Sequence, residues 1–187
     1  MSKLATKDII VEIADQLFYQ QGYQHTSFAD ISNEVGISRG NFYHHFKSKD
    51  DILDAVIQRR LANTEKMLND WQEDEQTSLE QIRCFINILI MNRAKIKLYG
   101  CPVGTLTTEL AKLDHPSLID ANKVFSLFAD WLEKRFLDLG QKENAKELAL
   151  HLLARSQGIA TIASAFQDET VLYREVETLN EWLTTYS

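Results

Sequence analysis

At three places where a helix is expected to start, a Ser or Thr is followed three residues later by an acidic residue. The three pairs are Ser27 with Asp30, Ser48 with Asp51, and Thr77 with Glu80. In such a capping box the hydroxyl and the carboxylate each accept a hydrogen bond from a backbone amide at the start of the helix. Ser38 is a further candidate N-cap. The pattern therefore favours several separately started helices.

Helices are the expected element along the whole chain. Seven glycines and two prolines are few for 187 residues, and strand-like alternation is scarce. The expected helices cover about residues 7–21, 28–35, 38–45, 48–69, 77–98, 105–113, 116–140 and 142–166, followed by a last helix with Asp168 as its N-cap. We predict an all-α protein with one sizeable core, or one core with a small appended module.

The first 50 residues have the organisation of a helix-turn-helix unit. The helix expected over 7–21 carries its apolar residues on one face, and Gly22 follows it as a natural C-terminal residue. The two short helices that come next are separated by a tight connection containing Gly36. Two helices joined by a turn of three or four residues with a glycine form a helix-turn-helix.

A local excess of positive charge falls on the second of these short helices. The chain has a formal net charge of −7, yet no acidic residue lies between Val35 and Lys49. Basic and aromatic side chains gather there, namely Arg39, Phe42, Tyr43, His44, His45, Phe46, Lys47 and Lys49. A face of this kind can approach phosphates while the rest of an acidic molecule is repelled by them.

The first residues of that helix are the candidates for reading a DNA sequence. A recognition helix lies in the major groove with its N-terminal residues at the base edges. Arg39 can bind guanine bidentately, and Asn41 has the donor and acceptor that suit adenine. Gly40 has no side chain, which allows close approach to the groove floor.

Neighbouring side chains have more general roles. Lys49 lies in the first turn of the following helix, where free amides already favour an anion, and Lys47 can add a non-specific charge contact. Phe42 and Phe46 are expected in the core, because they lie one helical turn apart on the face opposite Arg39.

The N-terminal part of the chain resembles the DNA-binding domain of the TetR/AcrR family of bacterial transcriptional regulators. The resemblance rests on the helix expected over 7–21, on the pairs Gly22-Tyr23, Thr26-Ser27 and Asp30-Ile31, and on the run 36–53. The matching positions are Gly36, Ile37, Ser38, Gly40, Phe42, Tyr43, His45, Phe46, Ser48, Lys49, Asp50 and Leu53. The similarity covers about the first 55 residues, and the remainder is similar only in length and helical character. It implies a DNA-binding domain in residues 1–50 and a helical ligand-binding and dimerisation domain in residues 51–187.

The resemblance also implies which side chains contact the DNA backbone. They are Tyr43, His44 and His45, with Thr26 and Ser27 at the start of the first short helix. Ser27 and Ser38 are helix caps first, and any phosphate contact is an addition to that role.

A dimer on a palindromic operator is expected, because one such module offers too little surface for tight specific binding. The resemblance implies a four-helix interface, here from about residues 116–139 and 142–166. It further implies repression that a small-molecule effector relieves. The candidate effector-lining residues are Trp71, Phe85, Asn92, Arg93, Tyr99, Leu106, Phe125, Phe128 and Trp131. Arg93 either meets an anionic ligand or pairs with Glu109.

Cys101 is a separate candidate for the effector site. It lies at the expected start of a helix, where the helix dipole favours a reactive thiolate, and basic residues precede it. A subgroup of the family has a similar Gly-Cys pair, and some of its members sense electrophiles. Cys84 lies in an apolar stretch and is expected to be buried.

Other classes of protein are disfavoured. The apolar stretches fall short of the ~18 residues that span a bilayer, and the N-terminus has no apolar leader, so we expect a cytoplasmic protein with no membrane partner. His44 and His45 lack a third ligand, and the cysteines lack zinc spacing, so neither metal nor cofactor is expected. Catalytic motifs are missing as well. The rival interpretations are an all-α enzyme and a purely structural helical dimer.

Overall fold

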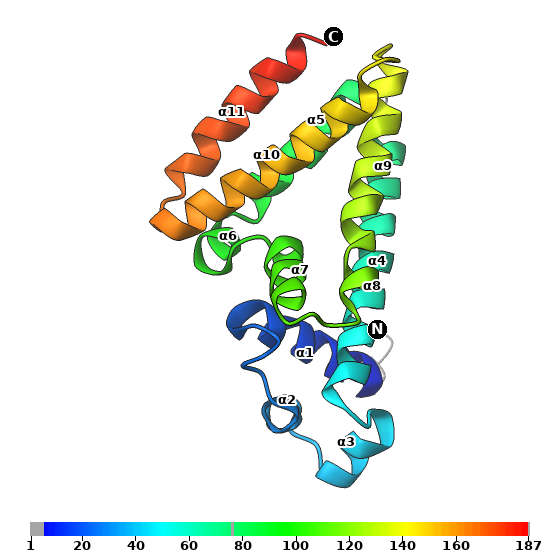
Figure 1. The fold of residues 1–187 in the computed structure, drawn as a ribbon, viewed down its shortest axis with the longest axis vertical. Coiled ribbons are helices and arrows are strands. Elements are labelled where there is room, and N and C mark those ends of the chain that lie inside the picture. The colour runs from blue at the N-terminus through cyan, green and yellow to red at the C-terminus, as the bar shows by residue number, and fades with distance from the viewer. Residues whose placement is uncertain (1–5, 76, 187) are drawn as a thin grey trace. The chain divides into compact units, whose positions relative to one another are not determined.

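The computed structural model describes residues 6–75 and 77–186, and at residue 39 the backbone alone. The described residues form eleven α-helices and no β-strand, which confirms the all-α prediction (Figure 1). They include no helix that is both long and apolar enough to cross a membrane. The chain forms two compact units, the N-terminal unit of residues 1–63 and 105–123 and the C-terminal unit of residues 64–104 and 124–187.

The N-terminal unit holds helices from both of its stretches. They are α1 (Thr6–Gln21), α2 (Phe28–Val35), α3 (Arg39–His45), the first part of α4 (Lys49–Asp74), most of α7 (Pro102–Lys112) and α8 (Leu118–Ala121). Its core contains Phe18 from α1, Phe42 from α3 and Leu110 from α7. Residues 105–123 therefore share one apolar core with the predicted helix-turn-helix.

The predicted helix caps at Ser27, Ser38, Ser48 and Thr77 are confirmed, whereas the N-cap of the last helix is Glu169 and not the predicted Asp168. Ser27 and Asp30 exchange both capping-box hydrogen bonds, and those from Ser27 hold the pKa of Asp30 below its usual value. Ser48 Oγ accepts from the Asp51 amide at 3.0 Å, and Asp51 Oδ2 accepts from the Ser48 amide at 3.0 Å. Ser38 and Thr77 likewise accept hydrogen bonds at the starts of α3 and α5.

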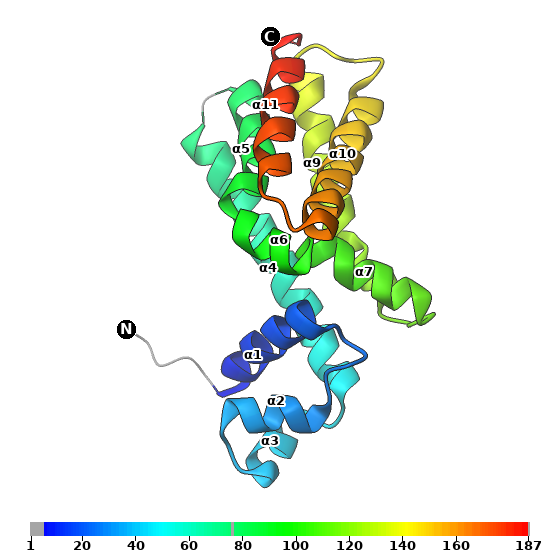
Figure 2. The same cartoon turned by 90° about the vertical axis from the view of Figure 1, so that its left-hand side faces the viewer.

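The C-terminal unit is a bundle of longer helices. Its members are α5 (Ser78–Met91), α6 (Arg93–Tyr99), α9 (Lys123–Asp138), α10 (Ala145–Phe166) and α11 (Thr170–Thr184), with the end of α4 and the first residues of α7. In both views α11 runs alongside α10 and α5, and α10 also packs on α6 (Figure 2). Asp168 accepts a hydrogen bond from the Thr170 amide at 2.8 Å, close to its predicted capping role.

Two predicted helices are interrupted. The helix expected over 77–98 breaks at Asn92, whose φ of −103° and ψ of 10° depart from helical values. Its backbone amide and its side-chain amide both donate to Ile88 O, at 3.1 and 2.9 Å. The helix expected to start at Pro116 begins at Leu118 and is divided at Asn122 into α8 and α9, while the Ser117 amide donates to the ring of His115. Hydrophobic spacing alone does not reveal either interruption.

A buried arginine joins three helices of the C-terminal unit. Arg135 of α9 is 5% exposed, and its Nη1 donates to Gln72 of α4 and, at 2.9 Å, to Gln81 of α5. Its Nε lies 3.3 Å from Asp138 Oδ2, and its guanidinium lies against the ring of Trp131. Because a buried charge is tolerated only when it is paired and hydrogen-bonded, this network stabilises the arrangement of the three helices.

We predict that Arg135→Ala lowers the free energy of unfolding by about 2–4 kcal/mol, since it removes the donor to the buried side-chain oxygen of Gln81 and to that of half-buried Gln72. Urea denaturation followed by circular dichroism measures the effect. Lys134→Ala, on the exposed side of the same helix, is the control and should change stability by at most about 0.5 kcal/mol. Equal stability of the two variants would contradict the assigned role of the network.

Candidate nucleic-acid interface

Helix α3 presents two different sides. Phe42 and Phe46 are buried in the core of the N-terminal unit, as predicted, while Asn41, Tyr43 and His44 are exposed. The helix starts at the cap of Ser38, whose Oγ accepts from the Asn41 amide at 3.4 Å. The burial of the two phenylalanines thus decides which side chains of α3 reach solvent.

Gly40 lies on the exposed side of α3, and no steric contact with the described part of the chain requires a glycine there. A methyl group in place of its hydrogen would have no atom of another part of the described chain within 4 Å. Glycine inside a helix costs about 1 kcal/mol relative to alanine. The position therefore sacrifices helix stability without any packing benefit in the isolated chain.

The aromatic and basic side chains around α3 lie in well-defined places. The ring of Tyr43 packs 5.0 Å from that of Phe28 in α2 and remains 50% exposed. The rings of His44 and His45 are neighbours at 5.4 Å, and no group of His, Cys, Asp or Glu among the described residues is arranged to hold a metal ion. Lys47 is exposed, with its Nζ donating to Tyr43 O at the end of α3.

Not every residue predicted to meet DNA is exposed. Thr26 is 0% exposed, and its hydroxyl donates to Gly22 O at 2.7 Å. Lys49 is half-buried, with its Nζ 2.9 Å from Tyr23 O and 4.0 Å from the centre of the Tyr23 ring. Ser27 is exposed at its cap, and His45 is half-buried. The side chain of Arg39, the predicted guanine reader, lies outside the described residues.

Tyr23 is buried beneath this surface, and its contacts were not predicted from the sequence. Its hydroxyl donates to Asp50, and burial together with that hydrogen bond raises its pKa. Its ring also contacts Phe18 and His115 edge-on, at 5.3 and 5.1 Å. The sequence signal for it is the pair Gly22-Tyr23 in the family resemblance, which lies in the connection between α1 and α2.

The predicted effector residues do not form one cluster. Trp71 pairs with Trp131 at 5.8 Å, and Phe85 pairs with Phe128 at 5.4 Å, all within the C-terminal unit. Leu106 belongs instead to the core of the N-terminal unit. Three further residues predicted to line the effector site are half-buried, namely Tyr99, Cys101 and Phe125.

The side chains of Asn92 and Arg93 have partners near the junction of α5 and α6. Asn92 donates to Ile88 O, and Arg93 donates to Ile90 O at 3.1 Å. Arg93 also forms an ion pair with Glu169 at 3.7 Å, so the expected alternative of a pair with Glu109 is wrong. Cys84 is half-buried, and burial raises the pKa of its thiol.

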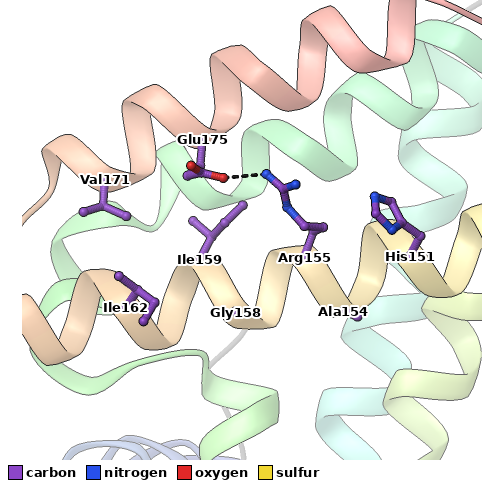
Figure 3. A pocket seen from close by; sticks show the side chains of 8 residues that line it. All are labelled: His151, Ala154, Arg155, Gly158, Ile159, Ile162, Val171 and Glu175. Atoms are coloured by element: carbon purple, nitrogen blue, oxygen red, sulfur yellow. Dashed lines mark hydrogen bonds and ion pairs between the residues drawn. The ribbon is translucent and has the colours of Figure 1, made fainter.

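An open groove lies between α10 and α11, with a volume of about 460 Å³. Its lining residues are His151, Ala154, Arg155, Gly158, Ile159, Ile162, Val171 and Glu175. Figure 3 shows Arg155 and Glu175 pointing toward each other from the two helices, and Arg155 Nη2 donates to Glu175 Oε2 at 2.6 Å. No predicted effector residue lines this groove.

Comparisons with known proteins agree with this geometry. Residues 10–56 match the family model described as bacterial regulatory proteins, tetR family. An uncharacterized HTH-type transcriptional regulator in the lacX 3′ region of Lactococcus lactis subsp. lactis is 32% identical, over 89% of this chain and 87% of the relative. The HTH-type transcriptional repressor DhaR of Mycobacterium sp. strain GP1 is 24% identical, over 82% of this chain and 77% of the relative.

The same similarity extends to solved structures. The crystal structure of a TetR transcriptional regulator from Legionella pneumophila superposes with a TM-score of 0.84 and 25% sequence identity, covering 97% of this chain and 98% of that one. The relatives and the structural neighbour are transcriptional regulators rather than enzymes. With its helix-turn-helix, its helical C-terminal unit and a relative matched over most of its length, this chain belongs to the TetR/AcrR family of DNA-binding transcriptional regulators.

Proposed function

We propose that the chain is a repressor that binds a palindromic operator as a homodimer and leaves it when a small molecule binds. The observation that carries the proposal is the exposed Gly40 in α3, which costs helix stability and fills no need of the isolated chain. Close contact between α3 and the floor of the major groove would explain why a glycine occupies position 40. The repressor DhaR among the relatives supports the direction of regulation.

Base reading is assigned to Arg39 and Asn41, on either side of Gly40. An arginine binds guanine through two hydrogen bonds, and an asparagine binds adenine in the same way. We assign contacts to phosphates to Ser27, Tyr43, His44 and Lys47, which are all exposed around α3. His45 is half-buried and adds to this surface.

The second copy is proposed to pack on α10 and α11. Exposed apolar side chains there are Leu150, Ile162, Phe166 and Tyr173. Gly158 faces the groove between these helices, and a methyl group in its place would contact no other part of the described chain within 4 Å. We therefore retain the predicted segment 142–166 and favour α11 over residues 116–139 as its companion.

The effector is proposed to bind in the C-terminal unit. The two aromatic pairs, Trp71 with Trp131 and Phe85 with Phe128, offer flat apolar surfaces that suit a small organic molecule. Cys101, half-buried just before α7, stays the candidate for reaction with an electrophile. Such a ligand acts by binding the DNA-free state more tightly than the DNA-bound state.

The first prediction from this proposal separates base contacts from phosphate contacts. A duplex enriched by the full chain from a random-sequence library is compared with scrambled duplexes over a range of salt concentrations. Arg39→Ala should weaken discrimination at one base pair by about 1–3 kcal/mol. Lys47→Ala should weaken binding to every duplex alike and reduce the salt slope by about 0.9. Failure to enrich any duplex would refute the proposed function.

A second prediction uses the open space at Gly40. Gly40→Ala should raise the free energy of unfolding by up to about 1 kcal/mol, because alanine is the better helix former. The added methyl group should nevertheless lower affinity for the enriched duplex about tenfold, since it stands between the helix and the groove floor. Thermal unfolding and fluorescence anisotropy measure the two effects, and unchanged affinity would argue against close approach of this helix to DNA.

A third prediction concerns the dimer. Gly158→Leu should shift the protein from dimer toward monomer in analytical ultracentrifugation, because a large side chain fills the line of contact proposed for the second copy. Lys146→Leu adds the same side chain to an exposed position of α10 outside the groove and serves as the control. If the Gly158→Leu variant dimerises as tightly as the Lys146→Leu control, the interface lies elsewhere.

A further inference from the structure

The connection between α1 and α2 is held by a carboxylate from a distant part of the sequence. Glu109 of α7 accepts a hydrogen bond from the Tyr23 amide through Oε2 and from the Gln24 amide through Oε1, both at 2.8 Å. Two successive backbone amides that converge on one anion form a compact binding site for negative charge. Hydrogen bonds to an ionised acceptor are stronger than those between neutral groups.

Gly22 is adapted to the same carboxylate. Its φ of +89° lies in the left-handed region that favours glycine. A methyl group on Gly22 would lie 3.0 Å from Glu109 Oε1 and 3.1 Å from Oε2. The absence of a side chain therefore permits both the turn of the backbone and the approach of Glu109 to the two amides.

The carbonyl side of the connection is held from α4. Lys49 Nζ donates to Tyr23 O at 2.9 Å, and the Tyr23 hydroxyl donates to Asp50. The Thr26 hydroxyl closes the turn onto Gly22 O at 2.7 Å. Residues 22–26 are thus fixed through their N–H groups by α7 and through a carbonyl and a ring by α4.

This connection determines the course of the next two helices. Ser27 caps α2 directly after Thr26, and the ring of Phe28 in α2 packs on Phe42 in α3 at 4.7 Å. A displacement of residues 22–26 therefore moves α2 and, through this contact, the exposed side of α3. Glu109 itself belongs to α7 and carries a charge that phosphates repel.

We propose that Glu109 is a positioning residue for operator recognition, and that its carboxylate holds the helix-turn-helix in the geometry that reads DNA. The inference rests on the proposed binding of DNA by α3. The direction in which specific affinity changes when the Glu109 charge is removed distinguishes this proposal from a simple charge effect. Removing a negative charge from a DNA-binding protein strengthens non-specific attraction to phosphates, whereas loss of positioning weakens recognition of the specific sequence.

The test compares Glu109→Gln with the control Glu12→Gln in the full chain. Both variants remove one negative charge from the N-terminal unit, but Glu12 pairs with Arg59 at 3.2 Å, on α1 and α4, rather than with the connection. The probes are the duplex enriched by the wild-type chain and a scrambled duplex of equal composition. We expect Glu109→Gln to lower the ratio of specific to non-specific affinity about tenfold, and Glu12→Gln to leave it unchanged.

Several readouts separate the possible outcomes. Partial unfolding of Glu109→Gln would reduce binding to both duplexes equally and leave the ratio intact, so a lowered ratio reports positioning and an intact ratio overturns the proposal. Glu109→Asp retains the charge with a shorter side chain and should lower the ratio as well, because one carboxylate can then no longer reach both amides. Absence of any enriched duplex for the wild-type chain refutes the proposed function instead.

Discussion

The packing of Phe42 and Phe46 against the N-terminal core fixes the orientation of α3, and the functional surface follows from it. A helix of seven residues is well below the length of about 12–15 residues at which isolated helices become even marginally stable in water. It forms here because its two phenylalanines are buried among side chains of other helices. Since these rings occupy one side, the polar residues between them are directed to solvent.

Charged residues serve two different purposes in the N-terminal unit. Asp30 and Asp51 bind backbone amides at helix starts, Lys49 binds a carbonyl, and Glu109 binds two amides of the α1–α2 connection. These charges act within the protein. Lys47 also donates to a carbonyl, that of Tyr43, but it lies exposed in the stretch of the sequence that contains no acidic residue. An acidic protein can approach a polyanion in this way through one limited surface, which favours a single orientation on DNA.

Local sequence patterns predicted the local structure well. The capping boxes at Ser27 and Ser48, the turn at Gly36 and the buried side of α3 follow from residues within a few positions of each other, where hydrogen bonds and helical spacing decide the conformation. At Thr77 the hydroxyl caps the helix, but Glu80 accepts from that hydroxyl and not from the backbone amide. The interruption at Asn92 was missed because the apolar spacing continues on both sides of it. The backbone of Asn92 departs from helical angles there, with φ of −103° and ψ of 10°, and hydrophobic periodicity does not report such a local change.

Contacts between distant residues were the weaker part of the prediction. The partners of Lys49 and Arg93 are distant in the sequence and lie outside helices, Tyr23 in the α1–α2 connection and Glu169 at the N-cap of α11. Only the fold brings them within reach. The groove between α10 and α11 was likewise unforeseen, because it depends on how two helices pack. The burial of Arg135 was not predicted, because its neighbouring sequence does not distinguish a buried arginine from an exposed one.

The N-terminal unit is assembled from two separate stretches of the chain, and this limits how far it can be treated as a portable module. Leu106 and Leu110 fill the same apolar core as Phe18 and Phe42. A fragment that ends soon after the family match would lack these leucines and the carboxylate of Glu109, leaving an open apolar face and two unsatisfied amides. Recombination between relatives that exchanges only the first stretch would therefore have to preserve compatibility with residues 105–123.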